Sequence, residues 1–160
     1  MFVKGGGEPV LIQVPQAEKK PVNPGTVSAD RLRHPLPEAV KHAMADANRS
    51  WQAGKIAEAR KKLAPVVAKY PDFWEPHVSL GIIEMRLQDF AAAAADFTKA
   101  HELEPHSPVA ALYSGFTLYE THRIDEAESA VKAALALEPG NKLARMLLDR
   151  IQEGKAPATN

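Results

Sequence analysis

Two consecutive stretches carry the pattern that decides the fold: residues 74–107 read WEPHVSLGIIEMRLQDFAAAAADFTKAHELEPHS, and residues 108–141 read PVAALYSGFTLYETHRIDEAESAVKAALALEPGN. A step of one copy length connects equivalent positions in the two copies, namely Gly81 with Gly115, Phe90 with Ile124, Ala93 with Ala127, Ala100 with Ala134 and Pro105 with Pro139. A fixed period near this length indicates stacked helical pairs, because one pair cannot bury its apolar face alone.

The same step backward reaches a third and weaker copy, residues 40–73. Ala47 stands where the later copies have glycine, and Pro65 lies inside the expected second helix. An interior proline costs on the order of 3 kcal/mol and often bends a helix, so the straightness of this helix stays open. Beyond the third copy, residues 142–153 predict a capping helix with four apolar residues on one face: Leu143, Met146, Leu147 and Ile151.

The spacing of these small, bulky and proline positions resembles the tetratricopeptide repeat (TPR) family. The resemblance implies an all-α, right-handed α-solenoid of three helical pairs with a C-terminal capping helix. The expected domain is residues 37–153, with repeats 40–73, 74–107 and 108–141, the cap 142–153, and a tail 154–160. We expect helices of the second and third pairs at about 74–87, 90–103, 108–121 and 124–137.

Residues 1–36 differ from the repeats and predict an extended N-terminal arm or linker. They hold four of the nine glycines and five of the thirteen prolines. Between Pro9 and Pro15 lies a short run of mostly β-branched residues, which favours an extended conformation: Val10, Leu11, Ile12 and Val14. This arm segment is expected either to be disordered or, as we favour, to dock on a surface of its own chain or of a second copy; whether it forms a strand stays open.

In TPR proteins the first helix of each pair lines a concave groove, and the resemblance therefore implies a binding site. Four sets of residues, each spaced by one repeat length, are expected to face this groove, and we call each set a row. They are Met44, Val78 and Leu112; Asn48, Ile82 and Phe116; Trp51, Met85 and Tyr119; and the polar row Gln52, Arg86 and Glu120. Eight of the first nine are apolar or aromatic. An exposed patch of this kind marks an interaction site, although we expect about a third of the set to be buried core.

The predicted function is therefore a protein–protein interaction module that binds an apolar or aromatic segment, as an adaptor, assembly factor or chaperone-like scaffold. The size and apolar groove also resemble the small three-repeat chaperones of bacterial secretion systems. Binding of acidic C-terminal tails is not expected, because only Asn48 fits the two-carboxylate clamp that the family uses for them; the other clamp positions hold Met44, Ser79, Val109 and Tyr113.

The alternative is a structural protein that assembles into homo-oligomers. The arm could join copies, or the charges could pair head to tail. Residues 40–73 carry seven basic and three acidic side chains (net +4), residues 74–107 two and six (−4), and residues 108–141 two and five (−3). We favour a solvated surface over head-to-tail pairing as the explanation of these charges.

Other classes of function have little support in the sequence. Equal numbers of basic and acidic residues, 20 each, do not favour a nucleic-acid partner. The six histidines lack a metal-ligand spacing. Asp89, Asp96, Glu102 and Glu104 are expected on an exposed helix, with no partner that would raise a catalytic pKa. We therefore predict no metal, no cofactor and no enzymatic activity. No apolar stretch suggests a signal peptide or membrane insertion, and the compartment is open between cytoplasm and periplasm.

Overall fold

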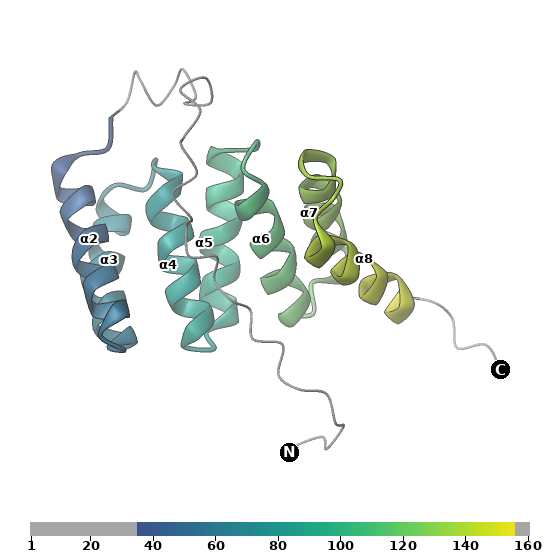
Figure 1. Cartoon of the computed structure of the whole chain (residues 1–160), viewed down its shortest axis with the longest axis horizontal. Coiled ribbons are helices and arrows are strands. Elements are labelled where there is room, and N and C mark those ends of the chain that lie inside the picture. The colour runs from purple at the N-terminus through teal and green to yellow at the C-terminus, as the bar shows by residue number, and fades with distance from the viewer. Residues whose placement is uncertain (1–34, 156–160) are drawn as a thin grey trace, which may run out of the picture. The chain divides into compact units, whose positions relative to one another are not determined.

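The computed structural model describes residues 35–155, and the predicted arm segment (Val10, Leu11, Ile12 and Val14) and the tail after residue 155 lie outside this part. Within it the chain forms seven helices in succession (Figure 1): α2 (Glu38–Gln52), α3 (Ile56–Lys69), α4 (Trp74–Arg86), α5 (Phe90–Leu103), α6 (Pro108–Glu120), α7 (Ile124–Leu137) and α8 (Lys142–Lys155). The predicted all-α class, with three helical pairs and a capping helix, is confirmed.

Each helix packs against the next one in the sequence, and α2 also contacts α4 while α6 contacts α8. The first helices of the pairs therefore lie along one side of the stack, and α8 takes the place of a fourth first helix. None of the seven helices is both long and apolar enough to cross a lipid bilayer.

The chain turns in the same way at the end of each first helix. Gly54, Gln88 and His122 stand at equivalent positions of the three repeats and have φ values of 74°, 62° and 60°. The following N–H groups, of Lys55, Asp89 and Arg123, bond back across the turn to the carbonyls of Ser50, Glu84 and Leu118 at 2.9 to 3.0 Å. This is the left-handed Schellman end of a helix, and it fixes the angle at which the second helix returns.

Small residues allow the helices to pack closely. A Cβ atom at Gly81 would lie 2.9 Å from the Phe97 ring, and one at Gly115 would lie 2.5 Å from Val131 Cγ2. Alanines fill most other buried positions of α5 to α7, so the core is built from close backbone approach as much as from large side chains.

One question about the helices that the sequence left open is settled by the structure, and one expectation is partly wrong. Helix α3 runs without a break through Pro65, whose side chain is exposed. In α8 the predicted apolar face is partly wrong: Leu147 and Ile151 are buried, but Leu143 and Met146 are 49% and 60% exposed. Ala144 is buried in their place, because α8 packs in the register of a first helix rather than around its largest side chains.

Candidate functional site

The twelve residues predicted to line the groove all lie on the first helices of the three pairs. We call them the first-helix face; they are Met44, Asn48, Trp51 and Gln52 on α2, Val78, Ile82, Met85 and Arg86 on α4, and Leu112, Phe116, Tyr119 and Glu120 on α6. The eight apolar or aromatic members are all partly exposed, and the four polar members are exposed. None of the twelve is buried, whereas we expected about a third of the apolar and aromatic members in the core.

The apolar members of this face are anchored on one side. Met44 and Trp51 pack against the buried cluster of the first two pairs, and Leu112 and Tyr119 pack against that of α6 to α8. The ring of Phe116 meets that of Phe90 edge to face, at 6.3 Å between centroids and 68° between planes. Rings held in this way keep one side available to solvent while losing little further rotamer freedom on binding a ligand.

Three further exposed apolar residues extend the pattern, and the sequence-based prediction did not include them. Val109 on α6 is 47% exposed, and Leu143 and Met146 on α8 are the two exposed residues noted above. Met146 stands one repeat length after Leu112, and Leu143 stands one repeat length after Val109. Continuing the period into the capping helix would have found both, because α8 has the register of a first helix.

On the other side of α4, the ionisable side chains of His77 and Glu84 are buried, while Arg60, which reaches them from the first pair, is 41% exposed. Asp96 of α5 lies 2.6 Å from Nδ1 of His77, whose Nε2 lies 3.0 Å from the carbonyl oxygen of Pro71. Arg60 of α3 lies 3.3 Å from Oε1 of Glu84, which follows His77 by about two helical turns on α4. The expectation that Asp96 sits on an exposed helix surface is therefore wrong, since its side chain is only 15% exposed.

Burial raises the pKa of Glu84 to about 8, with a further contribution from a hydrogen bond to the Asp96 carboxyl group and from its charge. Arg60 acts in the opposite direction, but its guanidinium is shared with Asp89, whose Oδ2 it reaches at 3.2 Å. Glu84 is therefore favoured in its neutral form inside the fold.

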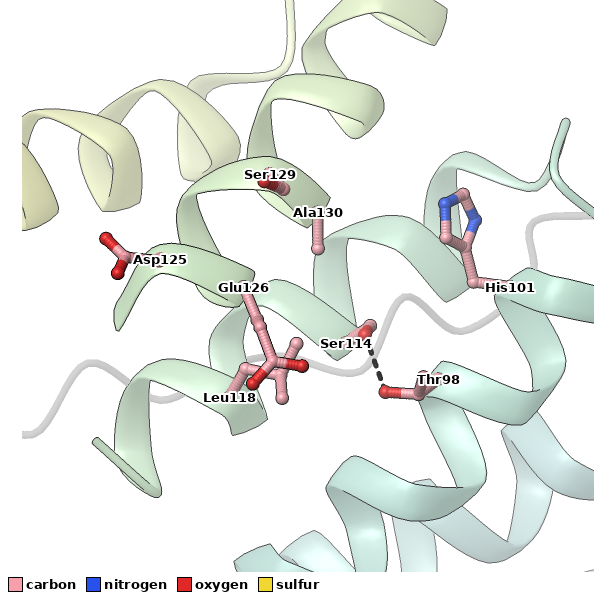
Figure 2. A pocket seen from close by; sticks show the side chains of 8 residues that line it. All are labelled: Thr98, His101, Ser114, Leu118, Asp125, Glu126, Ser129 and Ala130. Atoms are coloured by element: carbon pink, nitrogen blue, oxygen red, sulfur yellow. Dashed lines mark hydrogen bonds between the residues drawn. The ribbon is translucent and has the colours of Figure 1, made fainter. Parts of the chain in front are cut away.

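A hollow with a volume of about 440 Å³ is lined by residues of α5, α6 and α7. Figure 2 shows the side chains that line it, among them Thr98 and Ser114, whose hydroxyls are joined by a hydrogen bond of 3.1 Å. Two carboxylates line it, but Glu126 is bound by Arg123 and Asp125 by Lys155. Ser114, which lines the hollow, stands where the preceding pair has the larger and buried Leu80.

The hollow does not have the arrangement of a catalytic site. Its carboxylates are already paired, and the ring of His101, which also lines it, is not hydrogen-bonded to either hydroxyl in the described structure. No base is therefore placed to activate these hydroxyls within residues 35–155. In the same part of the chain no group of three His, Asp or Glu side chains is placed to hold a metal ion. The first-helix face is the larger candidate, and its chemistry suits binding rather than catalysis.

Two family models described as tetratricopeptide repeat match the chain, one over residues 44–108 and the other over residues 84–151. Neutrophil cytosol factor 2 of Mus musculus is 29% identical over 105 residues, which is 63% of this chain and 20% of that protein. The chain thus spans about a fifth of the length of this relative.

Solved structures of low sequence identity share the fold. The second TPR domain of human RPAP3, determined with an HSP70 peptide, has a TM-score of 0.66 at 22% identity, covering 72% of this chain and 96% of that domain. The Yersinia enterocolitica type III secretion chaperone SycD, determined with a peptide of the translocator YopD, has a TM-score of 0.65 at 16% identity, covering 76% and 98%. At these identities the likeness concerns the fold alone.

Proposed function

Since the chain belongs to the tetratricopeptide repeat family and is a protein–protein interaction module, we propose that its first-helix face binds an apolar or aromatic segment of a partner polypeptide. The observation that carries this proposal is the partial exposure of eight apolar side chains at equivalent positions of three successive first helices. A monomeric soluble protein rarely leaves so many apolar side chains together in water without a partner for them.

The chemistry of this face favours an apolar ligand over an acidic one. The charged members of this face, Arg86 and Glu120, belong to the polar row and have opposite signs, so together they offer no net attraction for a carboxylate tail. Met44 and Met85 have unbranched side chains that adapt to different ligand shapes. HSP70 and YopD peptides accompany two proteins of similar fold, which supports peptide binding as the mode of action but does not name the ligand of this chain.

The face we propose continues onto the capping helix. Val109, Leu143 and Met146 would accept the end of a ligand that runs along α4 and α6, because Met146 is the fourth member of the row that starts at Met44. A partner segment could then contact four first helices in turn. Such a long contact suits an adaptor, an assembly factor or a chaperone-like scaffold that holds its client extended.

The test is selection of random displayed peptides on the full chain, followed by affinity measurements with purified variants. We expect selected peptides to carry spaced apolar or aromatic residues. Phe116→Ser and Met146→Ser should each weaken their binding by at least about tenfold, which corresponds to about 1.4 kcal/mol. Leu87→Ser is the matched control, because Leu87 is 37% exposed but lies in the turn after α4.

Circular dichroism of each variant separates lost binding from lost folding. Equal affinity of all three variants for the selected peptides would contradict the proposal. Light scattering of the ligand-free chain tests the alternative role in self-assembly: a monomer with intact peptide binding excludes it, and an oligomer that dissociates when Phe116 is replaced favours it.

A further inference from the structure

Two charged side chains of opposite sign flank the apolar part of the first-helix face. Arg86 is the last residue of α4 and Glu120 is the last residue of α6, one repeat length apart. Each follows an apolar member of the face by four residues, Ile82 and Phe116 respectively, so it lies one helical turn away on the same side of its helix. A ligand that covers Ile82 and Phe116 therefore has a charged side chain at its edge on both helices.

Neither charge has a partner within the described part of the chain. Arg86 and Glu120 are exposed, and among residues 35–155 neither forms an ion pair or a side-chain hydrogen bond. The exposed Lys41 of α2, by contrast, pairs with Glu38 of the same helix at 2.8 Å. The two charges beside the apolar surface thus remain available to a ligand.

The position of Glu120 is unfavourable for the helix that carries it. Carbonyl groups at the C-terminus of a helix give that end a partial negative charge, which favours basic over acidic side chains there. Arg86 follows this rule on α4, whereas α6 ends in an acidic residue and has no basic residue in its last turn. A basic side chain of a ligand beside Glu120 would supply the positive charge that this end of α6 lacks.

The spacing of the helices determines how far apart the matching charges of a ligand lie. First helices of successive pairs contact each other at α2–α4 and at α6–α8, and helices in contact have axes about 8–10 Å apart. With a similar spacing of α4 and α6, and about 3.3 Å per residue of an extended chain, ligand residues that face these two helices are about three positions apart. Beyond α6 the face continues to the exposed Leu143 and Met146 of α8. The ligand residue beside Glu120 is therefore nearer to this apolar end than the residue beside Arg86.

We propose that Arg86 and Glu120 set the register of the bound segment. Each pairs with a ligand side chain of opposite sign, so the ligand carries an acidic and a basic residue about three positions apart, with the basic one nearer to its α8 end. This inference rests on the proposed binding function and adds the charge pattern of the partner to it.

The apolar rows alone leave the register ambiguous. Because equivalent apolar residues recur on successive first helices, a ligand with spaced apolar residues can shift by one helix and still find an apolar surface. The two charges remove this ambiguity. A shift toward α8 places the acidic ligand residue beside Glu120, and a shift toward α2 places the basic one beside Arg86, so either shift brings like charges together.

The test exchanges the charges on both partners. Random displayed peptides are selected in parallel on the unmodified full chain and on the double variant Arg86→Glu, Glu120→Arg. A peptide selected on the unmodified chain is then synthesised as it is and with its acidic and basic residues exchanged, and the affinities of both peptides for both chains are measured. We expect matched combinations to bind about tenfold more tightly than mismatched ones, because two attractions replace two repulsions. The difference should shrink in about 1 M salt.

Lys99→Glu combined with Glu102→Lys on α5 is the control, because it exchanges an exposed ion pair on a second helix and should leave all affinities unchanged. Circular dichroism confirms that the variants fold, and the charge pattern of peptides selected on the unmodified chain is a measurement that needs no variant. Equal affinities in all four combinations, or selected peptides without the charged pair, would overturn the register and leave apolar peptide binding intact. Absence of any peptide binding by the unmodified chain would overturn the proposed function as well, so the two failures are distinguishable.

Discussion

Gly81 and Gly115 occupy equivalent crossings of a first and second helix, yet their surroundings differ in rigidity. A Cβ at Gly81 would meet only the ring of Phe97, at 2.9 Å. A Cβ at Gly115 would meet Val131 Cγ2 at 2.5 Å and also two backbone atoms, the Val131 nitrogen at 3.1 Å and the Ala127 oxygen at 3.2 Å. Relief at Gly115 therefore requires α6 and α7 to move apart as whole helices.

We therefore expect Gly115→Ala to lower the free energy of unfolding by about 1–3 kcal/mol, although alanine is the better helix former. Urea denaturation followed by circular dichroism measures this. Gly154→Ala is the matched control, because Gly154 is helical and a Cβ there meets nothing within 4 Å. It should raise stability by about 0.5–1 kcal/mol. A stabilising Gly115→Ala would show that the crossing has room to spare.

At the same scale the sequence could not reveal the buried network. Asp96 aligns with the exposed Lys62 of the first copy, and a single sequence shows polarity but not which polar groups face each other. The period nevertheless contained a signal, because His77 and Glu84 align with small or apolar residues in the other copies. A charged residue in a core register predicts a buried partner.

The turns between paired helices show how one element is repeated with different residues. The left-handed backbone at residues 54, 88 and 122 is occupied by glycine only in the first copy. Gln88 and His122 carry a Cβ in this conformation, which costs an ordinary side chain about 1–2 kcal/mol. Both are exposed, so neither gains compensating burial.

We expect Gln88→Gly to raise the free energy of unfolding by about 0.5–1 kcal/mol, the left-handed cost less the entropy that glycine loses on folding. Thermal unfolding of the variant measures this gain. Lys61→Gly is the control and should destabilise by about 1 kcal/mol, because Lys61 is exposed in the middle of α3 with ordinary helical geometry. A loss of stability in Gln88→Gly would mean that the turn is specified by the side chain rather than by the backbone.

The helix boundaries could be predicted from the sequence because the residues that begin and end the helices recur with the same period as the apolar residues. α5 and α7 have the expected bounds, and α4 and α6 end one residue early, at Arg86 and Glu120. The buried face of α8 could not be predicted in the same way. An amphipathic pattern shows that a helix has an apolar side, but not which of its apolar residues face the core. The repeat register places Ala144 inward, while Leu143 and Met146 remain exposed.

For the whole molecule, ionisable groups of opposite behaviour set the dependence of stability on pH. Lys132 and Lys155 hydrogen-bond Glu128 and lower its pKa to about 2, and Lys41 and Arg123 lower the pKa of Glu38 and Glu126. These carboxylates have a folded pKa below the ordinary 4.5, so their contribution is present above pH 4.5 and is lost as the pH falls toward 2. Glu38 and Glu126 are exposed, so their contribution is also weakened in high salt.

Glu84 acts with the opposite sign. Its folded pKa of about 8 lies above the ordinary 4.5, so its contribution is complete below pH 4.5 and is lost as the pH rises toward 8. The free energy of unfolding therefore rises with pH in the acid range (the acid limb) and falls at higher pH because of Glu84 (the alkaline limb). We expect it to be greatest near about pH 5 rather than at neutrality. Urea denaturation at a series of pH values measures this profile.

Glu84→Gln should remove the alkaline limb alone and move the stability maximum toward neutral pH, while added salt should flatten the acid limb alone. These two changes are separable because Glu84 is shielded from solvent between α3, α4 and α5, whereas Glu128 and Lys155 join α7 to α8 at the surface. A free energy of unfolding that rises steadily from about pH 5 to about pH 8 in the unmodified chain would contradict the protonation of Glu84. With a folded pKa of about 8, ionisation of this buried carboxyl group must lower the free energy of unfolding in that window.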